Sequence, residues 1–106
     1  MEQVLFLKPK EEIIIQDRAI YILEKKAING NLYLTTTKFL FINVTGNIEF
    51  YIPINNIMGV CSHGFMSKFL VIQYLSEKER PLQTTFKVKK ANQWVKAIHN
   101  VITIKK

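Results

Sequence analysis

The sequence of 106 residues has one cysteine, two histidines and no long apolar run. A single cysteine, Cys61, excludes an internal disulfide and fits a reducing compartment, and we expect it to be a small buried residue. No apolar stretch approaches the roughly 20 residues that cross a bilayer. The N-terminal residues also lack the basic start and apolar stretch of a signal peptide. These absences predict a cytoplasmic protein.

The sequence also lacks the residue groupings that metal binding and catalysis need. A metal site takes three or four converging ligands, whereas His63 and His99 lie far apart and the acids are scattered. Cys61 and His63 are close in sequence, but a nucleophile and its base also need an orienting group, and no acid is nearby. The four glycines are isolated, so no phosphate-cradling loop occurs. We therefore predict no enzymatic activity, no metal and no cofactor.

Positive charge dominates the sequence and is unevenly distributed. Fifteen Lys and Arg residues against eight Asp and Glu residues give a net charge of +7. Every acid lies at or before Glu79. After Arg80 the charged residues are all lysines, namely Lys87, Lys89, Lys90, Lys96, Lys105 and Lys106. A basic C-terminal third suits an acidic partner, with a solvated lysine-rich surface as the alternative interpretation.

Period-two apolar patterns predict seven strands. The first, residues 13–23, is rich in β-branched residues, and its imperfect alternation around residues 17–19 predicts a bend or bulge there. Loops are expected at residues 24–29 and 61–67. The other strands are expected at residues 31–35, 39–43, 48–52, 54–60, 68–75 and 82–88. Such short connections favour an antiparallel meander over parallel crossovers.

Helical spacing appears once, near the C-terminus, and predicts a helix at about residues 90–102. One apolar stripe runs along it, made of Ala91, Trp94, Val95, Ile98, Val101 and Ile102. An amphipathic helix must bury such a stripe, here against the sheet. Trp94 is the largest residue of the expected contact. His99 lies off the stripe and is expected to face solvent.

Two stretches of the sequence form a recognisable pattern, GNLYLT at residues 30–35 and KFLF at residues 38–41. They are similar to the glycine, leucine-tyrosine-leucine-threonine, basic, aromatic pattern of the GRAM domain, a branch of the pleckstrin-homology-like superfamily. Further similar positions are Phe6, Pro9, Glu12, Ile52, Pro53, Ile54, Ile57 and Val60. The expected helix with Trp94 resembles the tryptophan-bearing C-terminal helix of pleckstrin-homology folds. The resemblance implies a single, mainly β domain over residues 1–106. Its fold would be a seven-stranded, antiparallel, partly open barrel of two orthogonal sheets, capped by one C-terminal α-helix.

The resemblance also implies a function, since GRAM-type domains bind membrane phosphoinositides or other proteins and few are enzymes. Lipid-binding pleckstrin-homology domains meet phosphate with cations on the first two strands and the intervening loop. That loop here offers Lys25 and Lys26, with Lys38 at the next turn. Asn29 and Asn31 stand where phosphoinositide binders place basic residues. The implied function is a non-enzymatic adaptor, peripheral to an anionic membrane, with Lys25, Lys26 and Lys38 as candidate lipid-binding residues.

A protein and a nucleic acid are the two partners to consider besides a membrane. A protein-interaction module that uses the sheet edge or the helix groove, without lipid, is the main alternative. Nucleic acid is disfavoured because four phenylalanines fall in strand patterns, where we expect core packing rather than base stacking. These are Phe39, Phe41, Phe69 and Phe86. Phe65 and Met66 form a loop tip suited to a membrane interface or a protein contact, and packing beneath the barrel explains them equally well.

Overall fold

The computed structural model describes residues 9–64, 66 and 68–105, with side chains up to residue 103. Phe6 and Phe65, which the sequence singles out, lie outside the described residues. The elements are β1 (Ile13–Leu23), β2 (Lys26–Thr35), β3 (Lys38–Asn43), β4 (Ile48–Pro53), the 3-10 turn η1 (Ile54–Asn56), β5 (Ile57–His63), β6 (Phe69–Leu75), β7 (Pro81–Lys87) and α1 (Ala91–Lys105). No helix among the described residues is both long and apolar enough to cross a membrane.

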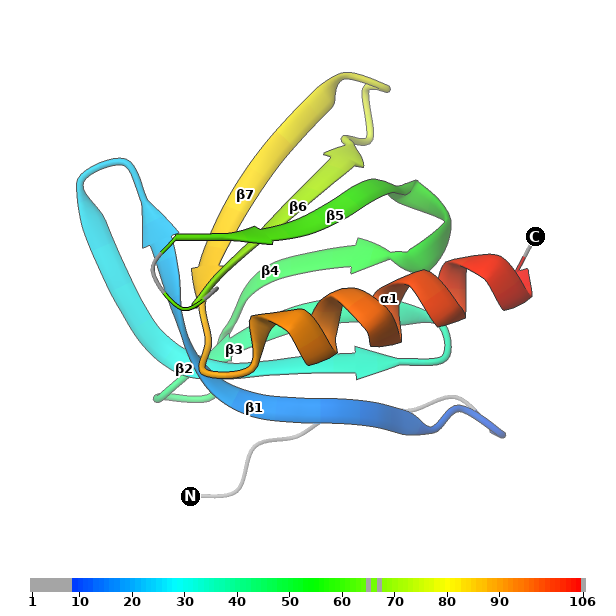
Figure 1. Cartoon of the computed structure of the whole chain (residues 1–106), viewed down its shortest axis with the longest axis horizontal. Helices are drawn as coiled ribbons and strands as arrows, with labels where there is room; N and C mark the ends of the chain where they lie inside the picture. Colours follow the sequence, from blue (N-terminus) through cyan, green and yellow to red (C-terminus); the bar gives the residue numbers. More distant parts are fainter. Residues whose placement is uncertain (1–8, 65, 67, 106) are drawn as a thin grey trace.

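The seven strands form one antiparallel sheet in the order β4-β3-β2-β1-β7-β6-β5. β1 pairs with β2 along its length, whereas only Ile20, Tyr21 and Ile22 also pair with β7. The sheet therefore folds over at β1 into two layers (Figure 1). α1 packs against β5, β6, η1 and β1, and so covers one end of the gap between the edge strands β4 and β5. The predicted mainly β fold with a C-terminal helix is confirmed.

A bend or bulge was predicted at residues 17–19 of β1, and the bulge is wrong, because the structure has none at these residues. Pairing is regular from Asp17 to Ala19, and the register shift lies between Ile13 and Ile15. Asp17 shares the inward face with Ala19, because its carboxylate accepts a hydrogen bond of 3.1 Å from Trp94 Nε1. A polar residue thus occupies an inward position that the sequence pattern would assign to an apolar one. This explains why the alternation looked broken.

Two predicted loops are shorter in the structure, because strands extend into them. β2 already begins at Lys26, so the turn after β1 contains only Glu24 and Lys25. β5 extends to His63, which places Cys61 on an edge strand, where it is exposed rather than buried as expected. Its neighbours in the strand face the other way, since Val60 packs on the core and Ser62 Oγ lies 2.5 Å from Asn92 Oδ1 on α1. Alternation therefore turns Cys61 outward.

The helix buries the predicted apolar stripe. Trp94 and Ile98 are fully buried, Ala91 and Val101 are buried, and Val95 and Ile102 are partly buried against the core. The Trp94 ring meets Phe39 edge-on, with ring centroids 6.0 Å apart. His99 is exposed, as expected. The contact between α1 and the sheet is thus centred on one indole that packs with its ring and hydrogen-bonds with its nitrogen.

The strand phenylalanines mostly lie in the core, as predicted. Phe39, Phe41 and Phe86 are fully buried and contact one another or their aromatic neighbours. Phe69 differs, because it is half-buried and its ring stacks with that of His63, with centroids 5.6 Å apart. The core therefore contains a group of aromatic rings in mutual contact among its aliphatic residues.

Candidate functional site

A hollow of about 330 Å³ lies where the sheet folds over at β1. Four cationic residues line it: Arg18, Lys68, Lys87 and Lys89. We call this hollow, with these four residues, the basic groove. Its remaining lining is made of Ala19, Ile20, Asn29 and Val88. The groove therefore combines positive charge with the amide of Asn29 and the apolar side chain of Ile20, while the side chains of Ala19 and Val88 are buried in the core.

The strand register brings these residues together from four separate parts of the chain. Ile20 of β1 pairs with Asn29 on one side and with Lys87 of β7 on the other. Lys87 also pairs with Phe69 at the start of β6. The Val88 N–H then donates a hydrogen bond of 2.9 Å to the Lys68 carbonyl, which fixes the end of the β5–β6 loop beside the chain leaving β7. The four cations thus converge because β7 is paired with β1 on one edge and with β6 on the other.

The charge in the basic groove is uncompensated among the residues that line it. None of the described residues lining the groove is acidic. Asp17 is next to Arg18 in sequence, but its carboxylate accepts the Trp94 hydrogen bond on the opposite face of β1. Four like charges around one hollow produce a local positive potential that attracts anions. Lysine offers phosphate a mobile charge, and arginine offers a planar pair of donors.

A second hollow of about 470 Å³ adjoins the basic groove and shares Arg18 and Asn29 with it. Gly30, Asn31 and Val44 complete its lining. A Cβ atom at Gly30 would lie 2.2 Å from the Ile42 carbonyl oxygen, so only glycine permits this close approach of β2 to β3. Asn29 and Asn31 both line this second hollow, where they offer amide hydrogen bonds instead of charge.

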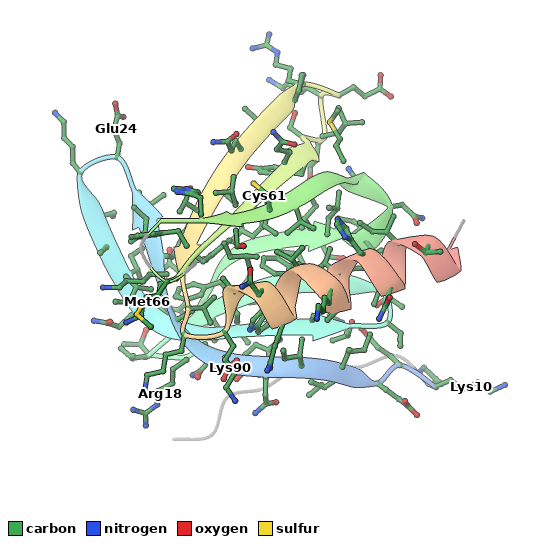
Figure 2. The ribbon with its side chains drawn as sticks, viewed as in Figure 1. Lys10, Arg18, Glu24, Cys61, Met66 and Lys90 are labelled. Atoms are coloured by element: carbon green, nitrogen blue, oxygen red, sulfur yellow. The ribbon has the colours of Figure 1, made fainter. Side chains whose placement is uncertain are left out.

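An exposed methionine stands close to this surface. Met66 lies in the β5–β6 loop, next but one to Lys68 of the basic groove, and 71% of it is exposed. Its backbone adopts a positive φ of 59°. Figure 2 shows Met66 at the same end of the molecule as Arg18 and Lys90. A flexible apolar side chain beside cations has the composition of a surface that touches headgroups with its charges and acyl chains with its apolar tip.

The three lysines singled out from the sequence are not brought together. Lys25 and Lys26 are exposed at the tip of the β1–β2 hairpin, which Figure 2 marks with Glu24. Lys38 begins β3, beyond the far end of β2. β2 has 10 residues, which at about 3.3 Å each corresponds to roughly 30 Å along the strand. Lys25 and Lys26 are therefore a separate pair from Lys38, although Lys26 lies on the strand that carries Asn29.

Lys38 is held by a buried carboxylate. Its Nζ lies 3.1 Å from Glu11, whose side chain is 0% exposed, while that of Lys38 is 12% exposed. The Thr37 hydroxyl donates to the same carboxylate at 2.5 Å, and the Thr35 hydroxyl also donates to it. Lys38 therefore neutralises an internal charge at the β2–β3 turn. Within the structure it acts as a stabilising residue of this turn.

The sequence alone did not predict that the four cations of the basic groove lie together. The lysine-rich C-terminal third indicated Lys87 and Lys89, but Arg18 and Lys68 are isolated cations with no local signal. They meet at one hollow because β7 pairs with β1 on one edge and with β6, next to Lys68, on the other. Within the described part of the chain, no three His, Cys, Asp or Glu side chains cluster as metal ligands would.

Comparison with known proteins shows the fold. No protein-family model matches the sequence, and no curated protein matches it. Among solved structures, the Vps36 N-terminal PH domain is 17% identical, with a TM-score of 0.66, 92% of this chain covered and 86% of that one. The C-terminal domain of an unknown protein from Leishmania infantum is 11% identical, with a TM-score of 0.69, 90% of this chain covered and 87% of that one.

A larger structure with the same similarity is the complex of PDZ-RhoGEF DH/PH domains with activated RhoA. It is 10% identical to this chain, with a TM-score of 0.75. The comparison covers 91% of this chain but only 31% of the DH/PH chain. At sequence identities this low, the similarity shows the fold alone. The chain therefore has the pleckstrin-homology-like fold.

Proposed function

We propose that this protein is a non-enzymatic adaptor that binds anionic membrane surfaces through the basic groove. One observation carries the proposal. Four cations from three parts of the chain surround one hollow, and no acidic residue lines it among those described. The proposed location is the cytoplasmic face of a membrane, as a peripheral protein. The exposed Met66 supports it by offering an apolar contact beside the charges.

The expected strength of this binding follows from simple magnitudes. Each Lys or Arg near an anionic membrane contributes about 1 kcal/mol, so four supply about 4 kcal/mol, which corresponds to a dissociation constant of about 1 mM. Burying an apolar side chain such as methionine adds about 1.5–3 kcal/mol. Together these terms give binding that is reversible and salt-dependent. Lys25 and Lys26 would add to it if the hairpin tip also reaches the surface.

We further infer that the chain is of the GRAM type, because the residues carrying that resemblance have defined roles here. Gly30 permits the close approach of β2 and β3. Leu32 and Leu34 are fully buried on the inward face of β2. Thr35 and Lys38 both bind the buried Glu11 carboxylate. The sequence pattern thus corresponds to one structural unit, the β2–β3 hairpin and its closing ion pair.

The test is charge reversal with a matched control. Lys68→Glu/Lys87→Glu changes the net charge by the same amount as Lys78→Glu/Lys96→Glu, in which neither residue lines the basic groove. In sedimentation with phosphatidylserine-containing vesicles we expect the first pair to weaken binding at least about tenfold, which corresponds to about 1.4 kcal/mol, and the second pair much less. Equal losses in the two variants would show that only net charge matters, and the groove would lose its role.

A phosphoinositide headgroup is the more specific candidate ligand for the same groove. Arg18 and the lysines are suited to phosphate oxygens, and Asn29 offers an amide to a hydroxyl group. Vesicles doped with a phosphoinositide are compared with phosphatidylserine vesicles of equal total charge. Stronger binding to the phosphoinositide, lost in Lys68→Glu/Lys87→Glu, would establish headgroup recognition. Equal binding would leave charge attraction as the whole of the interaction.

A further inference from the structure

β4 is an edge strand whose outer side borders a hollow. In the described part of the sheet, β4 pairs with β3 and is the last strand on that side. A hollow of about 410 Å³ lies between β4 and the β6–β7 hairpin, the hairpin at the top of Figure 1. Five consecutive β4 residues line it, from Glu49 to Pro53. Side chains of a strand alternate between the two faces of the sheet. Consecutive residues therefore line the same hollow along the backbone edge of the strand, not with the side chains of one face.

The backbone groups on this edge can be assigned from the register. The Ile54 N–H donates to the Thr37 carbonyl at 3.0 Å, directly after the pairs Lys38–Pro53 and Phe39–Ile52. Hydrogen-bonded and non-hydrogen-bonded pairs alternate along an antiparallel ladder. Ile52 therefore bonds toward β3, and the N–H and C=O groups of Tyr51 point away from β3, toward the hollow. The Tyr51 N–H is thus available to an incoming strand.

The wall opposite β4 is apolar and the rim is acidic. Tyr74 and Leu82 pair across the β6–β7 hairpin and both line the hollow, and Leu82 is 46% exposed. Burial, with a smaller contribution from Tyr21, raises the pKa of Tyr74, so this wall is uncharged at physiological pH. The charged residues lining the hollow are Glu49 and Glu77. This arrangement contrasts with the basic groove, which no described acidic residue lines.

We propose that the β4 edge captures an extended segment of a partner protein as an added strand, with an apolar residue against Tyr74 and Leu82 and a Lys or Arg near Glu49 and Glu77. An extended peptide gains affinity from backbone hydrogen bonds to such an edge and specificity from pockets for alternate side chains. The charge of the rim argues against a second copy of this chain, whose own β4 edge carries the same carboxylates. This second surface is independent of the membrane proposal.

A pair of substitutions at one position tests the backbone contact. Tyr51→Pro removes the outward N–H, whereas Tyr51→Thr keeps it and also loses the tyrosine side chain. Proline is tolerated on an edge strand where its missing N–H faces outward, and circular dichroism checks that the fold is kept. The probe is a displayed library of random dodecapeptides selected on the wild-type protein. The enriched peptides are then titrated by fluorescence anisotropy against both variants and against Glu49→Lys/Glu77→Lys.

We expect enriched peptides with alternating apolar residues and at least one Lys or Arg. Tyr51→Pro should weaken their binding at least about tenfold and Tyr51→Thr by less than about threefold, because the backbone bonds supply the affinity. Glu49→Lys/Glu77→Lys, which leaves the backbone intact, should also weaken it. Absence of any enriched peptide, or equal binding by Tyr51→Pro, would overturn the proposal. If the wild type self-associates and Tyr51→Pro abolishes this association, pairing between two copies of this chain would replace the proposed partner peptide. Unchanged vesicle binding by Tyr51→Pro would separate this surface from the basic groove.

Discussion

Trp94→Ala is expected to lower the free energy of unfolding by about 3–5 kcal/mol, the range for removing a large buried aromatic side chain. Trp94 is fully buried and packs edge-on against Phe39. Its loss also leaves the half-buried Asp17 carboxylate without the indole donor. Since small domains are stable by about 5–15 kcal/mol, the variant should lose a large share of its stability. Urea unfolding followed by far-ultraviolet circular dichroism measures the change.

Two further substitutions on the helix separate the contributions of Trp94. Trp94→Phe keeps a ring in the core but removes the hydrogen bond to Asp17, so we expect an intermediate loss. His99→Ala changes an exposed residue of the same helix and should stay within about 0.5 kcal/mol of the wild type. A Trp94→Ala loss as small as that of His99→Ala would contradict the role of the indole in attaching α1 to the sheet.

Glu11→Ala is expected to cost about 3 kcal/mol, the lower end of the range for removing one partner of a buried ion pair. The carboxylate receives Lys38 and the hydroxyls of Thr35 and Thr37. Lys38 keeps slight exposure, so its ammonium can turn toward water, which limits the loss. The change also weakens the connection between the residues before β1 and the β2–β3 turn. Thermal and urea unfolding report the effect.

A double-mutant cycle distinguishes the ion pair from general disruption. The cycle consists of Glu11→Leu, Lys38→Met and the double variant Glu11→Leu/Lys38→Met. The double variant should cost less than the sum of these two single substitutions, because each single substitution leaves the other charge without this partner in a poorly solvated place. Glu12→Ala is the matched control, since Glu12 is exposed and contributes its backbone N–H to Thr36. Strictly additive losses for Glu11 and Lys38 would show that the two do not interact.

Much of the fold was predictable because local periodicity survives folding. β1 matches its predicted bounds, and the helix buries the stripe read from its 3.6-residue spacing. The structure differs from the prediction at residues whose orientation depends on contacts with distant parts of the sequence. Asp17 points inward to reach Trp94, and Cys61 points outward because β5 runs further than its composition suggested. Tertiary contacts decide such positions, so a local pattern cannot show them.

The candidate site was less predictable than the fold. Composition identified the basic C-terminal lysines, but the grouping of Arg18 with Lys68, Lys87 and Lys89 depends on strand register and on the folding-over of the sheet at β1. Lys38 looked equivalent to Lys25 and Lys26 from sequence, because a buried carboxylate partner contributed by the residues before β1 leaves no local sign. Charge is visible in a sequence, whereas its neutralisation inside the fold is not.

The proposed adaptor would join two surfaces of opposite charge. The basic groove would face an anionic membrane, while the β4 edge with Glu49 and Glu77 would receive a cationic extended segment. Like-charge repulsion disfavours exchange of these partners, since a cationic segment is repelled by the groove and an anionic membrane by the acidic rim. Such an arrangement lets one small domain hold a partner at a membrane.

The most direct test of the membrane proposal is sedimentation of the wild-type protein with three kinds of vesicle: neutral, phosphatidylserine-rich and phosphoinositide-doped. We predict pelleting with both anionic kinds and not with the neutral kind. The bound fraction should fall steeply as ionic strength rises past about 0.15 M, where electrostatic screening shortens to about 8 Å. Absence of pelleting with any lipid at low salt would contradict the membrane proposal and leave partner binding at the β4 edge as the function to pursue.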